Sequence, residues 1–252
     1  MSEKLFLITN DDGHRALGIQ VLADILEKLG EVVIVAPEIE QSACSHAITL
    51  HRPLRVNTFG PNRYTVDGTP TDCVLLASQA LLPRKPDAIF SGINHGNNLG
   101  DDITYSGTVA GAFEGTLLGV RSMSISASDT GRIADTRTQE ILLELLGQLL
   151  SHTWPKDVLL NINMPTNEMP LRGVRMTSLG RRHYAESVIE KTDPRGKVYY
   201  WIGGANPLWY ENENSDFHAL AQGYITVTPL HLDLTHYPSL EDFKKFESLF
   251  QA

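Results

Sequence analysis

Apolar and polar residues alternate near the amino terminus in blocks that predict a strand, a helix and a second strand. Leu5–Thr9 is a continuous apolar run, followed by a polar turn. From Leu17 to Leu29, apolar residues recur at the spacing of one helix face, and Gly30 ends the pattern. Glu31–Ala36 is a β-branched apolar run, typical of a parallel strand buried on both faces. The first 36 residues therefore predict a βαβ unit.

Later segments continue this alternation. Thr69 is placed to cap a helix that begins with Pro70, and Asp72 lies three residues after the cap, as in a capping box. The other elements predicted in this region are strands at Asp87–Phe90, Arg121–Ala127 and Val158–Asn163, and helices at Gly107–Leu118 and Thr136–Leu150. We predict an α/β fold with a Rossmann-like, mostly parallel sheet and helices on both faces.

Beyond Pro165 the pattern changes, because Tyr, Trp, Gly and charged residues dominate from Gly180 to Gln222. The clear strand in this stretch is Val198–Gly204. The stretch as a whole is too aromatic to be disordered and too irregular to extend the parallel sheet. The predicted organisation is an α/β core at 1–180, a protruding hairpin or arm at 181–222 used in oligomer contacts, and a returning strand with a C-terminal helix at 223–252.

The last predicted helix carries its own start signal. Ser239 with Asp242 is predicted as its cap. Its apolar residues recur at helical spacing and are expected to face inward: Leu240, Phe243, Phe246 and Phe250.

Composition narrows the class of protein. With 252 residues, 42% hydrophobic and 20% charged, the chain has the profile of an ordinary globular protein rather than a disordered one. Lys and Arg total 21 against 30 for Asp and Glu, a formal charge of -9, which argues against long nucleic acid or anionic membranes as partners. Its only cysteines, Cys44 and Cys73, and the lack of a long apolar run favour the cytoplasm.

Polar residues gather directly after three of the predicted strands. These clusters are Asn10–Gly13, Pro37–His46 with Ser42, and Ser91–Asp102. Ligands of open α/β sheets bind outside the carboxyl ends of the strands, so we expect the chemistry of the protein there.

Asp11 and Asp12 are adjacent carboxylates, and burying both is costly unless a cation or a shared proton compensates. Their oxygens, with a Ser hydroxyl and an Asn carbonyl, form a hard ligand set that suits Mg²⁺, Mn²⁺ or Ca²⁺ rather than Zn²⁺. The alternative is that the two acids only stabilise a turn and the start of the next helix. We favour a metal site because the pair follows an apolar first strand.

The second signal is the glycine- and asparagine-rich segment Asn94–Gly107, which opens into a helix. Tyr105–Thr108, at the start of that helix, is a candidate phosphate cradle because helix N-termini present free N–H groups to anions. The alternative is a tight packing loop without a ligand. Gly111 and Gly115 inside the helix indicate that another element, expected to be the sheet, approaches closely.

Other candidates carry less weight. Cys44 and His46 are two residues apart, which is no established nucleophile–base geometry. His95 could contact a phosphate or relay protons, but it is equally consistent with a solvated loop residue. Tyr199–Trp201 could stack a base, although an aromatic strand more often packs a core or a subunit contact. Besides a metal-dependent enzyme, two classes of protein with an acidic pair stay open: an aspartyl-phosphate phosphatase and a phospho-receiver or nucleotide-sensing module.

In combination, these motifs resemble the SurE (stationary-phase survival protein) family of metal-dependent nucleotidases. The matching segments are Ile8–Gly13 (ITNDDG), Gln41–Ala43 (QSA), Val66–Val74 (VDGTPTDCV), Ser91–Gly115 (from SGIN through YSGTVAGAFEG) and Gly223–Leu230 (GYITVTPL). They run through most of the chain.

The resemblance implies specific residues and partners. One divalent cation per subunit, Mg²⁺ or Mn²⁺, would be held by Asp11, Asp12, Ser42 and Asn94. Phosphate would be bound by Asn98, Ser106, Gly107 and Thr108. We take Asp11 and Asp12 as the catalytic residues, because either acid could accept the proton of an attacking water. The implied substrates are nucleoside monophosphates, as 5′ or 3′ esters, and sometimes short polyphosphate. The implied assembly is a homodimer or homotetramer with exchanged C-terminal segments.

Overall fold

The computed structural model describes residues 3–183, 188–202, 208–210 and 212–250. The strands are β1 Leu5–Thr9, β2 Glu31–Pro37, β3 Val56–Gly60, β4 Arg63–Val66, β5 Ala88–His95, β6 Arg121–Ala127, β7 Val158–Met164, β8 Gly173–Met176, β9 Arg182–His183, β10 Val188–Thr192, β11 Val198–Ile202, β12 Leu208–Trp209 and β13 Tyr224–His231. The α-helices are α1 Leu17–Leu26, α2 Pro70–Leu76, α3 Gly107–Leu117, α4 Thr130–Ala134, α5 Thr136–Ser151, α6 Asp216–Ala221 and α7 Tyr237–Phe243. A π-helix spans Ala77–Leu81, and 3₁₀ helices span Gly100–Tyr105 and Lys244–Leu249.

Within the described residues, nine strands form one sheet in the order β3-β4-β2-β1-β5-β6-β7-β13-β8. The strands from β4 to β7 run parallel, whereas β3 is antiparallel to β4 and β13 is antiparallel to β7. This confirms the predicted α/β class with a mostly parallel sheet. The short antiparallel pair β3–β4 was not predicted, because β3 is mostly exposed and neither strand carries an apolar run.

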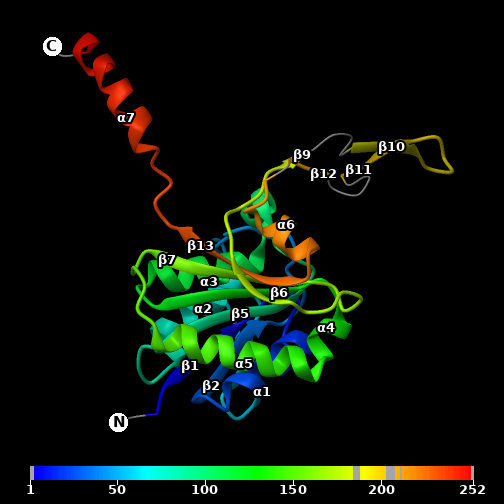
Figure 1. Ribbon diagram of the computed structural model, residues 1–252, viewed down its shortest axis with the longest axis vertical. Helices are drawn as coiled ribbons and strands as arrows, with labels where there is room; N and C mark the ends of the chain where they lie inside the picture. The colour runs from blue at the N-terminus through cyan, green and yellow to red at the C-terminus, as the bar shows by residue number, and fades with distance from the viewer. Residues whose placement is uncertain (1–2, 184–187, 203–207, 211, 251–252) are drawn as a thin grey trace.

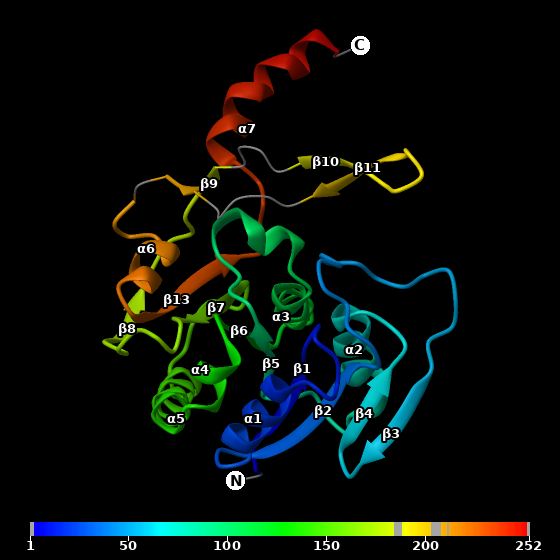
Figure 2. The same cartoon turned by 90° about the vertical axis from the view of Figure 1, so that its right-hand side faces the viewer.

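Helices cover both faces of the sheet, as Figures 1 and 2 show. Side chains of β1 alternate between the faces: Phe6 and Ile8 pack under α1 and α5, whereas Leu5 and Leu7 pack under α2. The capping box predicted at Thr69 and Asp72 is present at the start of α2. Helices therefore cover both faces of the sheet, which leaves the carboxyl ends of the strands as the place for a ligand.

Helix α3 lies unusually close to the sheet. A Cβ atom at Gly111 would lie 2.8 Å from Ser91 Oγ on β5 and 3.0 Å from a methyl carbon of Thr9 on β1. The glycine therefore lets the helix backbone sit directly on the strands, as its position in the sequence predicted. This packing fixes the amino end of α3 beside the carboxyl ends of β1 and β5.

One strand boundary near that edge differs from the prediction. Strand β5 continues to His95, five residues beyond the predicted end at Phe90, so Asn94 and His95 pair with β6 instead of lying in a loop. The pairing register shifts between Ser91 and Asn94, because the strand carries an irregularity there. The apolar pattern stopped at Phe90, whereas the backbone pairing did not.

Only part of the span 181–222 points away from the sheet. β10 and β11 form an exposed antiparallel hairpin that extends from the body of the molecule (Figure 1). In contrast, α6 packs against β13. Gly203 and Gly204, which we included in the aromatic strand, lie outside the described residues.

The prediction for the C-terminal helix is wrong in two respects. His236, not Ser239, is the N-cap of α7, and its ring accepts a hydrogen bond from the Ser239 amide. The residues expected to face inward are exposed, since α7 and the following 3₁₀ helix stand clear of the body (Figure 2): Leu240, Phe243, Phe246 and Phe250. Their spacing indicated an apolar face correctly, but this face has no partner among the described residues of one chain. No helix in the described part of the chain is long and apolar enough to cross a membrane.

Candidate active site

A cleft of about 190 Å³ opens where β1 and β5 end and α3 begins. Its lining residues are Asp11, Ser42, Ala43, Asn94, His95, Asn98, Asp102, Tyr105 and Ser106. The structure thus brings together five of the residues predicted to bind metal or phosphate, although they come from three separate segments of the chain. Asp12 lies beside the cleft, and Gly107 and Thr108 are buried behind it.

Asp11 is buried at the end of β1 and is held by the first turn of α3. Its Oδ2 atom accepts a hydrogen bond from the Thr108 amide at 3.0 Å, and its Oδ1 atom accepts one from the Thr108 hydroxyl. Burial raises the pKa of Asp11 to about 6, and the neighbouring charge of Asp12 adds to this effect. The ionised form of Asp11 is therefore disfavoured when no positive charge is near it. The two hydrogen bonds from Thr108 fix the orientation of the side chain.

The other predicted metal ligands leave oxygen atoms available. Asp12 uses Oδ2 to accept from the His95 amide at 3.1 Å, and burial raises its pKa as well. Asn94 donates its side-chain N–H to the Gly96 carbonyl at 2.7 Å, which orients the amide and leaves its carbonyl oxygen for another contact. The Ser42 hydroxyl is exposed and donates to Glu40 at 2.6 Å.

This donor set fits a hard divalent cation. In the described residues, no group of three His, Cys, Asp or Glu side chains comes together as a metal site, so a cation here would also need Ser and Asn oxygens. Two carboxylates with raised pKa values are stabilised by positive charge. All-oxygen sets of this kind suit Mg²⁺, Mn²⁺ or Ca²⁺.

Asn98 is fixed by a buried network of amides. Its carbonyl oxygen accepts from the side chains of Asn161 at 2.8 Å and Asn163 at 2.9 Å, both on β7. Its own side chain donates to the Ser126 hydroxyl on β6 at 2.8 Å. Because these partners occupy adjacent strands, Asn98 has a single orientation at the wall of the cleft.

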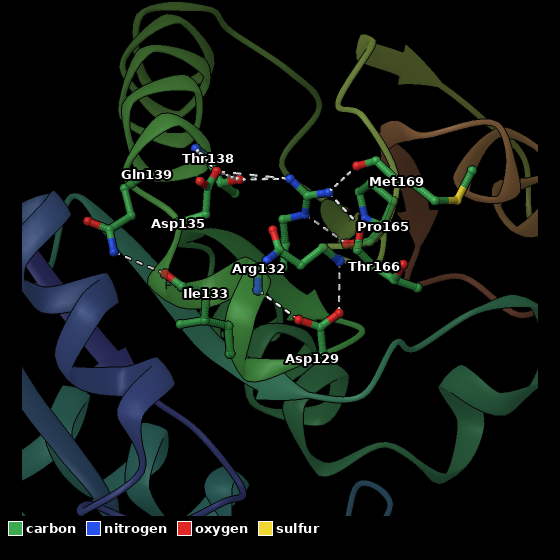
Figure 3. Close-up of polar contacts among 10 residues, drawn as sticks. Asp129, Arg132, Ile133, Asp135, Thr138, Gln139, Pro165, Thr166 and Met169 are labelled. Atoms are coloured by element: carbon green, nitrogen blue, oxygen red, sulfur yellow. Dashed lines mark hydrogen bonds and ion pairs between the residues drawn. The ribbon is translucent and has the colours of Figure 1, made fainter.

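The segment that follows β7 is held by a buried arginine. The Arg132 guanidinium donates to the carbonyl oxygens of Pro165, Thr166 and Met169, at 3.1, 2.5 and 2.6 Å (Figure 3). Immediately before that segment, the Met164 carbonyl accepts from the Asn97 side chain at 3.0 Å. Arg132 lies outside the cleft and fixes the segment that follows β7. That segment in turn supports Asn97 and Asn98.

The amino end of α3 forms the remaining wall. Ser106 is the N-cap, and its hydroxyl accepts from the Val109 amide at 3.1 Å. At Gly107, a Cβ atom would lie 2.8 Å from Cys44 Sγ and 3.0 Å from Asp11 Cβ, so only glycine allows the helix to start this close to the acid. The Thr108 amide donates to Asp11, so its contribution to the site is to hold that carboxylate.

Cys44 and His46 do not form a nucleophile–base pair. Burial raises the pKa of Cys44 to about 11, and Asp11 adds to the shift, so the thiol stays protonated at neutral pH. The His46 ring is 2.9 Å from Glu114 Oε2 instead. Cys44 nevertheless lies beside Gly107 at the start of α3, and His46 lies further along the same helix.

Sequence reasoning missed two residues that support this site: Asn161 and Asn163 hold Asn98 from β7. Asp102 and Tyr105 also line the cleft, and both lie in segments that the sequence indicated, although neither was assigned a role of its own there. The two asparagines do carry a signal, since they lie two residues apart in an otherwise apolar strand and therefore share one face. Asp102 is 2.6 Å from Arg182, which brings the start of the 181–222 span to the rim.

The fold and this cleft together define an α/β protein with an all-oxygen ligand set beside a helix N-terminus. The chain belongs to the SurE family, whose model, described as "Survival protein SurE", matches residues 6–186. This confirms the resemblance inferred from the motifs.

Similar proteins extend the match over nearly the whole chain. A protein of Pelobacter propionicus named 5'-nucleotidase SurE is 48% identical over 239 residues, covering 93% of this chain and 96% of its own. A protein of the same name from Syntrophotalea carbinolica is 47% identical over 248 residues, covering 98% of each. The crystal structure of the SurE protein from Aquifex aeolicus has a TM-score of 0.83 and 39% identity, covering 96% of this chain and 99% of that one.

Proposed function

We propose that this protein is a divalent-metal-dependent phosphatase that hydrolyses nucleoside monophosphates to nucleoside and phosphate. The observation that carries the proposal is the position of Asp11 against the first turn of α3, with Asn94 and Ser42 on the same cleft. Two carboxylates beside a helix N-terminus can attract both a cation and a phosphate. The curated relatives named 5'-nucleotidase SurE support a nucleotide as the substrate.

The proposed metal ligands are Asp11, Asp12, Ser42 and Asn94. A divalent ion bound there would supply positive charge to the phosphoryl oxygens as the ester is cleaved. Mg²⁺ and Mn²⁺ are the ions we propose, because the ligands are all oxygen.

The remaining residues of the site bind and orient the phosphoryl group. Ser106 and Gly107 present the amino end of α3, where the helix dipole favours negative charge. Asn98, fixed by its amide network, contributes a side chain at the opposite wall. Asp12 is the more accessible of the two acids, so we propose that it accepts the proton of the attacking water. Asp11, whose orientation is fixed, keeps the site in its arrangement.

A phosphorylated aspartate is less well supported. Both oxygens of Asp11 accept hydrogen bonds from Thr108, which lowers their reactivity toward phosphorus. A receiver module would need a phosphorylatable aspartate after a central strand, and Asn94 and His95 stand at the end of β5. A phospho-aspartate trapped after mixing with substrate would favour these alternatives.

The test is release of phosphate from nucleoside 5′- and 3′-monophosphates, sugar phosphates and short polyphosphate, with Mg²⁺, Mn²⁺ and Ca²⁺ supplied separately. We expect Asp12→Asn to lower turnover by two orders of magnitude or more, on the order of what metal and base residues contribute. Near-UV circular dichroism should show an unchanged fold. Full activity of this variant, or of wild-type protein after exhaustive chelation, would refute the metal proposal.

The assembly we propose is a homodimer or homotetramer with exchanged C-terminal segments. The exposed apolar face of α7 supports this proposal, since Phe243 is 63% and Phe250 is 85% exposed in a single chain. The exposed hairpin β10–β11, with Tyr200 and Trp201, offers a second surface of the same kind. Two free cysteines support a cytoplasmic location.

A further inference from the structure

A second cavity meets the phosphate cleft at Ser106. It has a volume of about 360 Å³, and we call it the α3 pocket. Its lining residues are His46, Ile103, Thr104, Ser106, Ala110, Phe113, Leu179, Leu230, His231 and Leu234. Ser106 lines both cavities, so the two meet at the start of α3.

The pocket follows one face of α3. Ser106, Ala110 and Phe113 are four and three residues apart, which places them in a row along the helix. At a rise of 1.5 Å per residue, the row from Ser106 to Phe113 is about 10 Å long. This is enough for a sugar and a base joined end to end, whereas a small phosphate ester would leave most of the pocket empty.

The walls suit a flat ring with polar edges. Ile103, Leu179 and Leu230 are apolar, and Phe113 contributes an aromatic ring. The His46 ring lies 6.1 Å from that of Phe113, measured between centroids, with 36° between the planes. Ligand pockets of this size typically combine apolar walls with a few fixed polar groups.

Glu114 fixes the polar group of the pocket. Its carboxylate lies 2.9 Å from His46 Nε2 and can only accept, so Nε2 carries the proton of this hydrogen bond, and Nδ1 is the ring atom left to act as an acceptor when the imidazole is neutral. Such an acceptor matches a ribose hydroxyl or an exocyclic amino group of a base. Thr104 also lines the pocket, with its hydroxyl donating to the Asp101 carbonyl at 2.8 Å.

We propose that the α3 pocket binds the nucleoside of the substrate, with the base against Phe113 and a hydrogen bond to His46. This inference rests on the phosphatase activity proposed above. It implies that the protein prefers nucleotides to small phosphate esters because of contacts along α3, remote from the reacting phosphorus.

The test compares kcat/KM for AMP and for glycerol 2-phosphate in the metal-loaded full chain. Base–aromatic stacking contributes about 1–3 kcal/mol, so Phe113→Ala should lower the ratio of the two values by about tenfold. Ala110→Leu, which fills the pocket, should lower the same ratio. Leu117→Ala is the matched control, because Leu117 is on the same helix, 59% exposed and outside the pocket.

The outcomes separate this inference from the proposed function. If wild-type protein with metal cleaves neither substrate, the phosphatase proposal itself fails. If it cleaves both but the ratio is near one, or is the same in wild type and in both pocket variants, the pocket does not bind the nucleoside. A change in sedimentation of Phe113→Ala without a change in the ratio would show that a second copy of the chain covers the pocket, and would also overturn the inference.

Discussion

Replacing Asp11 by asparagine should stabilise the metal-free protein at neutral pH. Burial raises the pKa of Asp11 to about 6 from the ordinary 3.8, so the folded protein binds more protons than the unfolded chain between these values. Its free energy of unfolding therefore falls as pH rises through this window. At about 1.4 kcal/mol per pKa unit, the loss above pH 6 is about 3 kcal/mol. The introduced asparagine has no charge to bury, and its amide can bond Thr108 in the same place.

Urea unfolding followed by tryptophan fluorescence in EDTA measures this effect. The linkage relation predicts that Asp11→Asn is more stable than wild type by about 3 kcal/mol near pH 7.5 and by about 1 kcal/mol near pH 4.5. Asp24→Asn, on the exposed side of α1, is the control and should show no such dependence. Saturating Mn²⁺ should stabilise wild type and not the variant. An advantage that does not change with pH, or a variant that is less stable throughout, would refute this account.

Two further variants test how α3 supports the acid. Thr108→Val removes the hydroxyl that donates to Asp11, a bond to a charged group worth about 1.5–3 kcal/mol, so the acid limb of the kcat/KM profile should move to higher pH. Gly107→Ala places a Cβ atom 2.8 Å from Cys44 Sγ, so kcat/KM should fall by about tenfold or more, while Gly147→Ala, in the middle of α5 and free of close contacts, should retain it.

The elements that local patterns determine were predictable from the sequence. β1, α1 and β2 follow from apolar periodicity, and Asp11 follows from its position after an apolar strand. The contact between Thr108 and Asp11 joins residues 97 positions apart, which no local pattern encodes. The same is true of Asn161, whose contact with Asn98 spans 63 positions.

The C-terminal helix shows the limit of periodicity in a different way. Apolar residues at helical spacing indicate that one face of α7 will be covered, but they do not say by which chain. Leu240 and Phe246 were expected to pack in the core of their own chain and are instead 44% and 46% exposed. An arrangement in which a second copy covers this face satisfies the same sequence pattern, and a single-chain prediction cannot distinguish the two.

The amino end of α3 already carries a negative charge from the protein itself. Because the Asp11 carboxylate accepts from the Thr108 amide, the positive end of the helix dipole is partly neutralised before any phosphate arrives. Asp12 adds negative charge near the same cleft, whereas the charge of Asp102 is offset by Arg182 at 2.6 Å. A phosphate dianion should therefore bind only together with a cation that offsets these carboxylates. Calorimetry should show phosphate binding with Mn²⁺ and none in EDTA, and equal affinity in both conditions would contradict a shared site.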